Sequence, residues 1–534
     1  MTFRQAALAI LTVLIMFVSA GPALIGSLQE QQISDRLELY QTDMVLQVSE
    51  LTLAVDDDQW VPVQVALVGK APVDAGLNAY QKTRQTAQDT LERLDDNIKQ
   101  LAGLTDTNGA GASSSGVQSQ VKLKELRTNS QTQQQLLNQL DINIGILQAA
   151  QGETTTAIQT WASLLPTHRS NSGDDVALVT HAVPLAQTLT GLWSDPPAIA
   201  PDAEQQIQQQ LTGWFRDRTL TQLYTLQDDA IALAVLQQST QDAAQKVAQK
   251  LALIGVGPVM GCIIGIGLII FMVVQRFVSG QTAILAEAQA QQWTPEWNWE
   301  TTWQVIIVGF FFVGQLVVPL MFQIIKPLLV DLGRSMSLME GQLTALLTLT
   351  VYIAMSAATI GVLYWSIKPY MPLDSEWFRV KVQEKWWLWG VGGYVVAIPL
   401  VIGVSIGNEY LWQGRGGSNP LLQIVLEEGN GLALGMFFFT AAIAAPVFEE
   451  ILFRGFILPS LTRYTSTWGA IALSSLLFAL AHLSVSEVLP LMTLGCVLGI
   501  VYTRSKNLLA PMMVHSLWNS ATMVGLLVLG SSMK

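Results

Sequence analysis

Long apolar segments flank one long polar region along the 534-residue chain. An apolar run extends from Ala6 to about Leu28, and from Leu251 onward apolar stretches dominate again. An α-helix of about 20 apolar residues is long enough to cross the hydrocarbon core of a bilayer. By that criterion, further spans are predicted at roughly 251–274, 305–325, 342–366, 387–406, 431–448, 468–483, 488–503 and 508–530. Together with the N-terminal run, the pattern predicts about nine membrane crossings.

The polar region between residues 29 and 250 is rich in Gln, Leu and Ala, and its apolar residues recur at three-to-four spacing, which predicts helices. Within it, Leu136–Leu165 resembles a tetratricopeptide-type helix pair, with a turn at Gly152 and with Ala157 and Trp161 on one helix face. An irregular helical bundle is the alternative, because a stable repeat array needs several such pairs. The Gly- and Ser-rich segment at 106–116 is predicted to be a flexible linker.

These changes in composition divide the chain into four segments. Residues 1–28 are predicted to form a signal anchor, favoured over a cleaved signal peptide because no AxA-like cleavage site follows the apolar run. Residues 29–250 form an acidic extramembrane helical domain, 251–300 a transmembrane helix with a linker, and 301–534 a membrane core. The predicted fold is all-α: a polytopic membrane helical bundle with an N-terminal extramembrane helical domain that is a candidate for the tetratricopeptide type.

The net charge of the chain resides in the polar region. Half of all residues are hydrophobic and 13% are charged, which is too apolar for an ordinary soluble domain. Residues 29–250 hold 26 Asp and Glu against 14 Lys and Arg, and so carry the whole net charge of −12. This acidity argues against binding of nucleic acid and against docking on an anionic lipid surface.

The basic residues of the short connecting loops predict the orientation in the membrane. Eight lie on the same side as Arg4 and four on the other, so the positive-inside rule places the N-terminus in the cytoplasm. Residues 29–250 then lie on the non-cytoplasmic side of a bacterial or plastid-type inner membrane. Four Trp residues within 293–303 predict an interfacial aromatic belt beside a span.

Six polar or ionisable residues occur in separate apolar segments of the membrane core. They are Glu449, Glu450 and Arg454 in PVFEEILFRG, His482 at the end of FALAH, and His515 and Asn519 in HSLWN. A charge at the centre of a membrane helix costs roughly 2.5–3.5 kcal/mol on insertion scales, so such residues mark a site. Glu450 and Arg454 have the i,i+4 spacing of an ion pair. The second carboxylate then needs another donor, for which His482 is the candidate.

The types and arrangement of these residues suit the hydrolysis of an amide bond by water. His515 and Asn519 are one helical turn apart and face the same side, and Pro511 places them near a helix start. Two such donors could stabilise a developing oxyanion, and a carboxylate backed by a histidine could deprotonate water. Ser516 points about 100° away from His515, so it is not a suitable nucleophile.

The three motifs resemble those of the CPBP family, which comprises CAAX proteases and bacteriocin-processing enzymes. EEILFR fits EExxxR, FALAH fits FxxxH and HSLWN fits HxxxN, in the order of the family, and the resemblance covers roughly residues 300–530. It implies an intramembrane glutamic endopeptidase that needs no cofactor or metal and acts on membrane-associated proteins or peptides. It implies three pairs of roles: water activation by Glu449 and His482, an oxyanion site of His515 and Asn519, and support of the geometry by Glu450 and Arg454. The added region 1–275 departs from the family core and leaves the substrate open.

Three other functions stay open at this point. A zinc metalloprotease could use the same Glu and His side chains as ligands, although the sequence has no HExxH motif. A non-catalytic membrane scaffold or immunity-type protein could bind a protein partner through residues 29–250, with the polar cluster only joining helices. A transporter could relay protons through the buried acids, although the membrane region shows no internal repeat.

Overall fold

The computed structural model describes residues 2–28, 34–51, 68–107, 114–165, 182–284, 286, 293–412 and 416–531. Every regular element in these ranges is a helix, which confirms the all-α prediction. Eight helical segments are long and apolar enough to cross a membrane: Phe3–Ser27, Ala230–Ser279, Trp299–Ser335, Glu340–Tyr370, Trp386–Trp412, Gly431–Leu461, Val488–Ser505 and Leu509–Gly530. The chain is a multi-pass integral membrane protein.

The ninth predicted crossing differs from the other eight. The apolar segment predicted at 468–483 forms α20 (Thr467–Leu480), which has only 14 residues. At 1.5 Å per residue such a helix is roughly 21 Å long, short of the hydrocarbon core of about 30 Å. The described residues therefore give eight long apolar helices and one shorter one.

The chain divides into two compact units, of which one comprises Ser34–Leu253 and the other Met1–Ile33 with Ile254–Ser531. We call them the polar unit and the membrane unit. The division is one of compactness, and the four functional domains proposed from the composition stay a prediction.

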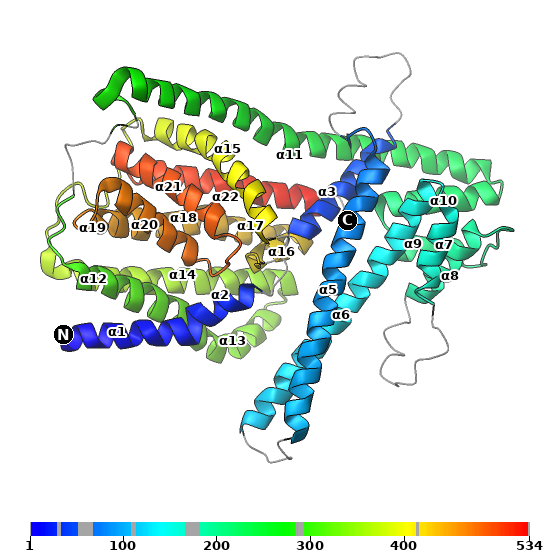
Figure 1. Cartoon of the computed structure of the whole chain (residues 1–534), viewed down its shortest axis with the longest axis horizontal. Helices are drawn as coiled ribbons and strands as arrows, with labels where there is room; N and C mark the ends of the chain where they lie inside the picture. Colours follow the sequence, from blue (N-terminus) through cyan, green and yellow to red (C-terminus); the bar gives the residue numbers. More distant parts are fainter. Residues whose placement is uncertain are drawn as a thin grey trace. The chain divides into compact units, whose positions relative to one another are not determined.

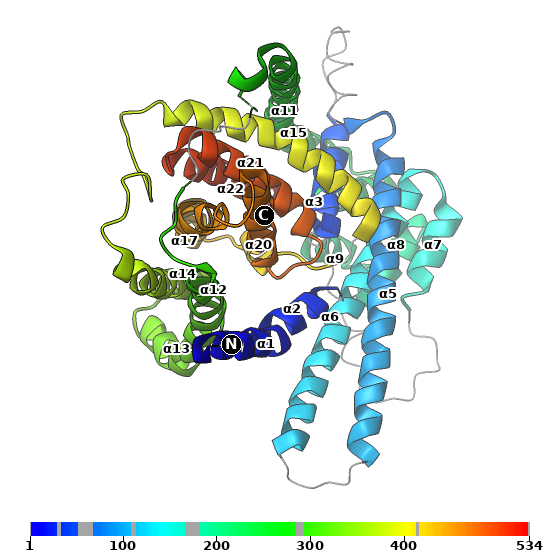
Figure 2. The same ribbon diagram turned by 60° about the vertical axis from the view of Figure 1, so that its left-hand side comes forward.

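A long antiparallel hairpin of α5 (Pro72–Thr107) and α6 (Ser114–Ala150) dominates the polar unit (Figures 1 and 2). The flexible linker predicted at 106–116 overlaps the end of α5 and the start of α6, and its residues 108–113 lie outside the described ranges. The other helices of the unit are α3 (Ser34–Ser49), α7 (Thr154–Ala162), α8 (Ala182–Trp193), α9 (Ala203–Gln210), α10 (Gly213–Leu226) and the first half of α11 (Ala230–Ser279). Their apolar faces share one hydrophobic core.

The predicted helix pair around Gly152 is present in the polar unit. Gly152 has φ +87°, a conformation that favours glycine, and lies in the turn between α6 and α7. Trp161 of α7 is fully buried against α6, where its Nε1–H donates to the carbonyl of Ile142 over 3.1 Å. However, α6 extends over 37 residues and pairs mainly with α5. The described part of the unit is thus an irregular helical bundle, which was the alternative to a repeat array.

The membrane unit packs its helices around two spans that are more buried than the others. These spans are Gly431–Leu461 and Val488–Ser505, each with 39% of its most apolar window buried. The first contains α17 (Gly431–Phe439), the π-helix η5 (Thr440–Ala444), α18 (Ala445–Glu450), the π-helix η6 (Ile451–Ile457) and α19 (Leu458–Leu461). The second is α21, which packs against α15 (Trp386–Trp412), α20 and α22 (Leu509–Gly530).

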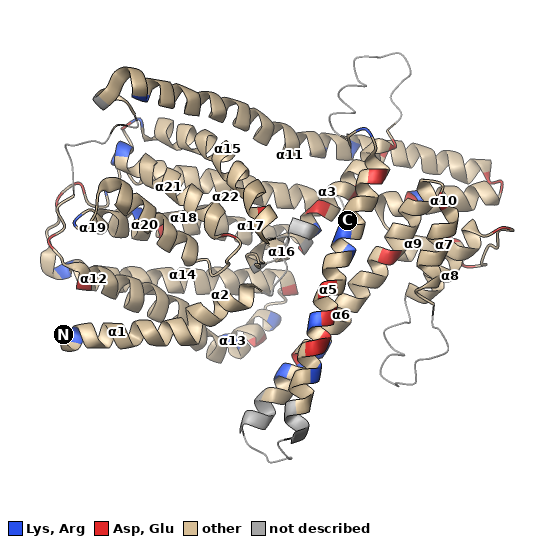
Figure 3. Cartoon of the chain, viewed as in Figure 1, with Lys and Arg blue, Asp and Glu red and all other residues tan. Residues whose placement is uncertain are grey.

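The remaining elements of the membrane unit surround these spans. They are α1 (Phe3–Ile15), η1 (Met16–Ala20), α2 (Gly21–Ser27), the second half of α11, η2 (Gly280–Thr282), α12 (Trp299–Gln304), η3 (Val305–Val317), α13 (Val318–Ser335), α14 (Glu340–Ile367), η4 (Lys368–Tyr370) and α16 (Pro420–Glu427). Figure 3 shows charged residues along α5 and α6 of the polar unit and few along α14, α21 and α22 of the membrane unit.

The prediction of an interfacial aromatic belt within 293–303 is wrong for two of the four tryptophans. Trp297 is 1% exposed, stacks on Phe456 with ring centroids 5.5 Å apart, and donates from Nε1 to Oγ of Ser460. Trp293 is also buried, with the Nζ of Lys506 3.3 Å from the centroid of its ring. These two side chains are core residues because the segment before α12 folds back onto the end of the span Gly431–Leu461.

Candidate active site

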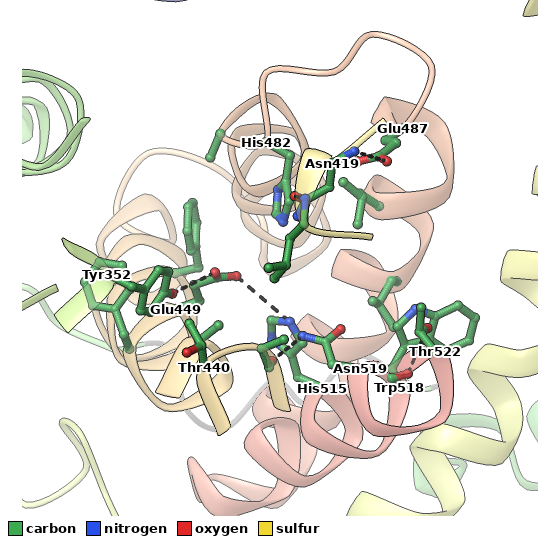
Figure 4. A pocket seen from close by; sticks show the side chains of 18 of the residues that line it. Tyr352, Asn419, Thr440, Glu449, His482, Glu487, His515, Trp518, Asn519 and Thr522 are labelled. Carbon is green, nitrogen blue, oxygen red and sulfur yellow. Dashed lines mark hydrogen bonds and ion pairs between the residues drawn. The ribbon is translucent and has the colours of Figure 1, made fainter. Parts of the chain in front are cut away.

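Four of the six predicted site residues line one pocket of the membrane unit. The pocket has a volume of about 540 Å³, and Glu449, His482, His515 and Asn519 all contribute to its wall (Figure 4). They come from three segments that are separate in the sequence: α18, the turn after α20, and α22. The structure therefore brings the three sequence motifs together.

Glu449 is the carboxylate that faces the pocket. Its Oε1 accepts a hydrogen bond from the hydroxyl of Tyr352 over 3.1 Å. Its Oε2 lies 3.9 Å from Nε2 of His515 and has no hydrogen-bond partner among the described residues. The side chain is 15% exposed. Burial without a full set of partners leaves one oxygen available to a ligand or a water molecule.

Glu450 and Arg454 lie behind the pocket wall and are both fully buried. Oε1 of Glu450 accepts from Nη1 of Arg454 over 2.8 Å, so the ion pair expected from the i,i+4 spacing is present. The same oxygen is 2.9 Å from Nδ1 of His515. Arg454 also donates from Nη2 to the carbonyl of Gly495 over 3.1 Å, and its guanidinium lies over the ring of Phe478. This cluster connects η6, α21 and α22 below the pocket.

His482 lies in the turn that follows α20 and is held by the end of that helix. Its Nδ1 lies 2.9 Å from the carbonyl oxygen of Phe478, one turn earlier in α20. The last carbonyls of a helix lack backbone donors, and a carbonyl can only accept, so the proton of His482 belongs on Nδ1. The lone pair of Nε2 is then free to accept a proton. No hydrogen bond or ion pair joins His482 to Glu449 in the described residues, and the donor to Glu449 comes instead from Tyr352.

Asn519 and Ser516 anchor α22 to two carbonyls in the helical turn before Pro446. Proline has no N–H, so one carbonyl in the preceding turn of a helix loses its usual partner. Nδ2 of Asn519 donates to the carbonyl of Ala441 over 2.8 Å, and Oγ of Ser516 donates to that of Ala442 over 2.6 Å. Both carbonyls belong to the π-helix η5, a geometry that is frequent at functional sites. The second N–H of the Asn519 amide is not used by this contact.

Two pocket residues were not singled out from the sequence. Tyr352 of α14 interrupts the apolar run of its helix, and its hydroxyl binds Glu449. Glu487 lies in the loop between α20 and α21, where it was not distinguished from other loop acids. Among the described residues, no group of three His, Cys, Asp or Glu side chains is arranged to hold a metal ion.

Fold and pocket together define a polytopic α-helical membrane protein with two carboxylates and two histidines in the wall of one cavity of the membrane unit. Comparison with known proteins agrees with this class. Residues 431–521 match the family model of type II CAAX prenyl endopeptidase Rce1-like proteins, and this segment contains all three motifs. The resemblance to the CPBP family is therefore confirmed.

Two bacterial proteins show the extent of the similarity. The chain is 26% identical to the putative membrane peptidase YdiL of Bacillus subtilis over 137 residues, which are 26% of this chain and 55% of that protein. It is 25% identical to the membrane-embedded CAAX protease MroQ of Staphylococcus aureus over 181 residues, which are 33% of this chain and 71% of that protein. The chain thus spans about half the length of the first of these relatives. No solved structure matches the chain.

Proposed function

We propose that the protein is an intramembrane endopeptidase that hydrolyses peptide bonds of membrane-associated proteins or peptides. The observation that carries the proposal is the convergence of Glu449, His482 and His515 on one pocket, with Oε2 of Glu449 free of hydrogen bonds in the described structure. The names of both relatives describe membrane peptidases, which supports the same reaction class.

The proposed reaction uses a water molecule as the nucleophile. Glu449, assisted by Nε2 of His482, takes a proton from the water. At the same time the water oxygen attacks the carbonyl carbon of the peptide bond. The tetrahedral intermediate carries an oxyanion, which the side chains of His515 and Asn519 stabilise. The C–N bond then breaks and the proton passes to the leaving amine. General base catalysis of this kind contributes roughly 10²–10⁴ in rate.

The geometry sets a condition on His515. Its Nδ1 faces Oε1 of Glu450 at 2.9 Å, and that carboxylate is already paired with Arg454. When Nδ1–H donates to this oxygen, Nε2 can donate to an oxyanion only if it carries a proton as well. Support of an oxyanion therefore needs the doubly protonated ring, held between the carboxylates of Glu449 and Glu450. In this role Glu450 and Arg454 position His515 rather than touch the substrate.

The polar unit is proposed to bind or deliver protein substrates, with the lipid bilayer as the second partner. The name of the Staphylococcus relative refers to CAAX cleavage, and that specificity is not carried over to this chain. The substrate is proposed only as a peptide segment of a membrane-associated protein.

The test compares membrane peptides in cells that carry the wild-type protein or the Glu449→Gln variant. Glutamine is nearly isosteric but cannot act as a base, so fragments formed by the wild type should disappear. Glu428→Gln, which changes an acid outside the pocket, is the matched control and should keep the fragments. Equal function of Glu449→Gln at equal expression would instead support the scaffold. Loss of activity on chelation, with stoichiometric metal in purified protein, would support the zinc enzyme.

A further inference from the structure

The pocket wall carries acidic but no basic Lys or Arg side chains among the described residues. Its two carboxylates are those of Glu449 and Glu487. The other ionisable side chains in the wall are His482, His515 and Tyr352, and most of the remainder is apolar. Glu487 has no part in the proposed hydrolysis, so its presence in the pocket needs another explanation.

Glu487 is held on the opposite side of the pocket from Glu449 (Figure 4). It immediately precedes α21, and its Oε1 accepts the backbone N–H of Asn419 over 3.1 Å. Asn419 in turn begins α16, with its own side chain accepting from the N–H of Leu421. The carboxylate is therefore fixed by a backbone contact that engages one of its two oxygens.

The loop that carries Glu487 is locked by a buried polar cluster. The hydroxyls of Ser484 and Ser486 donate to the carbonyls of Gly416 and Gly417 over 2.7–3.3 Å. Nδ2 of Asn408 donates to the carbonyl of Ser486 over 2.7 Å. Buried hydrogen bonds of this kind fix a loop, because breaking any of them leaves a buried polar group without a partner. Glu487 is thus presented to the pocket by a rigid support.

The carboxylate of Glu487 lacks an ionic partner in the described structure. No described Lys, Arg or His nitrogen lies within 4.0 Å of it. Burial raises the pKa of Glu487 because its carboxylate has lost water, while the N–H of Asn419 and the nearby His482 act in the opposite direction. A partly desolvated carboxylate gains more from a cation than an exposed one does, and it disfavours an anion by the same physics.

We propose that Glu487 is a specificity residue that binds a cationic group of the substrate, a Lys or Arg side chain some distance from the bond that is cut. This inference rests on the proposed function, because only that function makes the ligand a peptide. The competing explanation is that Glu487 only anchors Asn419 and shapes the loop. A glutamine at this position keeps an acceptor for the N–H of Asn419 and removes only the charge, so the two explanations make different predictions.

The experiment measures binding separately from cleavage. Full-length Glu449→Gln protein in detergent is titrated with fluorescent apolar peptides of identical length, in which a single lysine is moved through every position. Each peptide has a partner with norleucine, which matches the lysine stem without its charge, and one with glutamate. For the Glu449→Gln protein, the Kd of each norleucine peptide is divided by the Kd of the matching lysine peptide. The same ratio is then measured for the Glu449→Gln/Glu487→Gln double variant, and the two ratios are compared. Glu449→Gln/Glu428→Gln is the control for loss of an acid outside the pocket.

We expect a ratio of at least about tenfold, equivalent to ~1.4 kcal/mol, at one or two adjacent peptide positions. The ratio should fall to about one in the Glu487→Gln background and persist in the Glu428→Gln background. A ratio near one in the Glu449→Gln parent, or one that survives Glu487→Gln, overturns the inference. Cleavage of the same peptides by the wild type is scored independently. Charge-selective binding without cleavage would count against the endopeptidase, whereas cleavage without charge selection would count against Glu487.

Discussion

The hydroxyl of Tyr352 donates to Oε1 of Glu449 over 3.1 Å and so joins α14 to the helix that carries the proposed base. Oε2 of the same carboxylate has no such partner and lies 3.9 Å from Nε2 of His515. The two oxygens therefore have different environments: one is fixed and the other faces a histidine in the pocket. Orientation of the proposed base thus depends on a residue outside the three sequence motifs.

Tyr352→Phe should lower kcat by about tenfold and change KM little. A hydrogen bond to a charged group contributes roughly 1.5–3 kcal/mol. Without the Tyr352 hydroxyl the carboxylate of Glu449 is less well positioned as a base, so part of this energy is lost from the transition state. The phenylalanine ring of the variant can still pack edge-on against Phe448. The measurement is steady-state cleavage of a peptide that the wild type cuts and Glu449→Gln does not. Tyr364→Phe, on the same helix and 46% exposed, is the control and should behave as wild type. Wild-type kcat for Tyr352→Phe would show that the hydroxyl has no positioning role.

Arg454→Met should destabilise the membrane unit strongly. It leaves the fully buried carboxylate of Glu450 without its cation, and breaking a buried ion pair from one side costs about 3–5 kcal/mol. Arg454→Met/Glu450→Gln removes both charges and should lose less stability than the single Arg variant. Thermal unfolding of the two variants in the same detergent gives the comparison. If the double variant is the less stable one, the pair is not a coupled unit.

The part of the site that could be predicted depends on local geometry. The ion pair of Glu450 and Arg454 follows from i,i+4 spacing on one helix, and the common orientation of His515 and Asn519 into the pocket follows from the same spacing in α22. Each relationship needs only the helical period, which the apolar pattern already indicates. The all-α class was predictable for the same reason.

Contacts between helices could not be predicted in this way. The sequence gives no distance between α14 and α18, so the bond from Tyr352 to Glu449 was not foreseen, and His482 was assigned to that carboxylate instead. The structure shows Nδ1 of His482 satisfied by the carbonyl of Phe478, in the last turn of the preceding helix α20. Trp297 was misplaced for a related reason, since interfacial and buried tryptophans look alike until the packing of the chain is known.

Pro446 and Asn519 should be coupled in stability. Asn519→Ala removes the donor to the part-buried carbonyl of Ala441, and loss of a hydrogen bond of this kind costs roughly 0.5–1.5 kcal/mol. Pro446→Ala restores a backbone N–H to the turn that contains this carbonyl, so the cost of Asn519→Ala should shrink in that background. A double-mutant cycle on thermal stability measures the coupling. Additive effects of the two substitutions would mean that the carbonyl finds no donor in the restored turn.

The polar unit should lose stability as the pH rises through neutrality. Asp43 of α3 accepts a hydrogen bond from the hydroxyl of Tyr80 over 2.6 Å. Burial raises the pKa of Asp43 from 3.8 to about 7, and the bond from Tyr80 opposes part of this rise. The folded state therefore binds the proton more tightly than the unfolded state does. The stability associated with that proton is fully present below about pH 4 and is lost as pH rises through about 7.

The free energy of local opening around α3 should accordingly decrease from pH 5 to pH 8 by a few kcal/mol, since each pKa unit corresponds to about 1.4 kcal/mol. Hydrogen exchange of the full-length protein, corrected for the intrinsic rate at each pH, measures this energy for peptides that cover α3. Asp43→Asn should remove the slope because the amide does not titrate. Glu38→Gln is the control on the same helix and should retain it, as the Glu38 side chain is 41% exposed and pairs with Lys82. A slope that persists in Asp43→Asn would assign the pH dependence to another group.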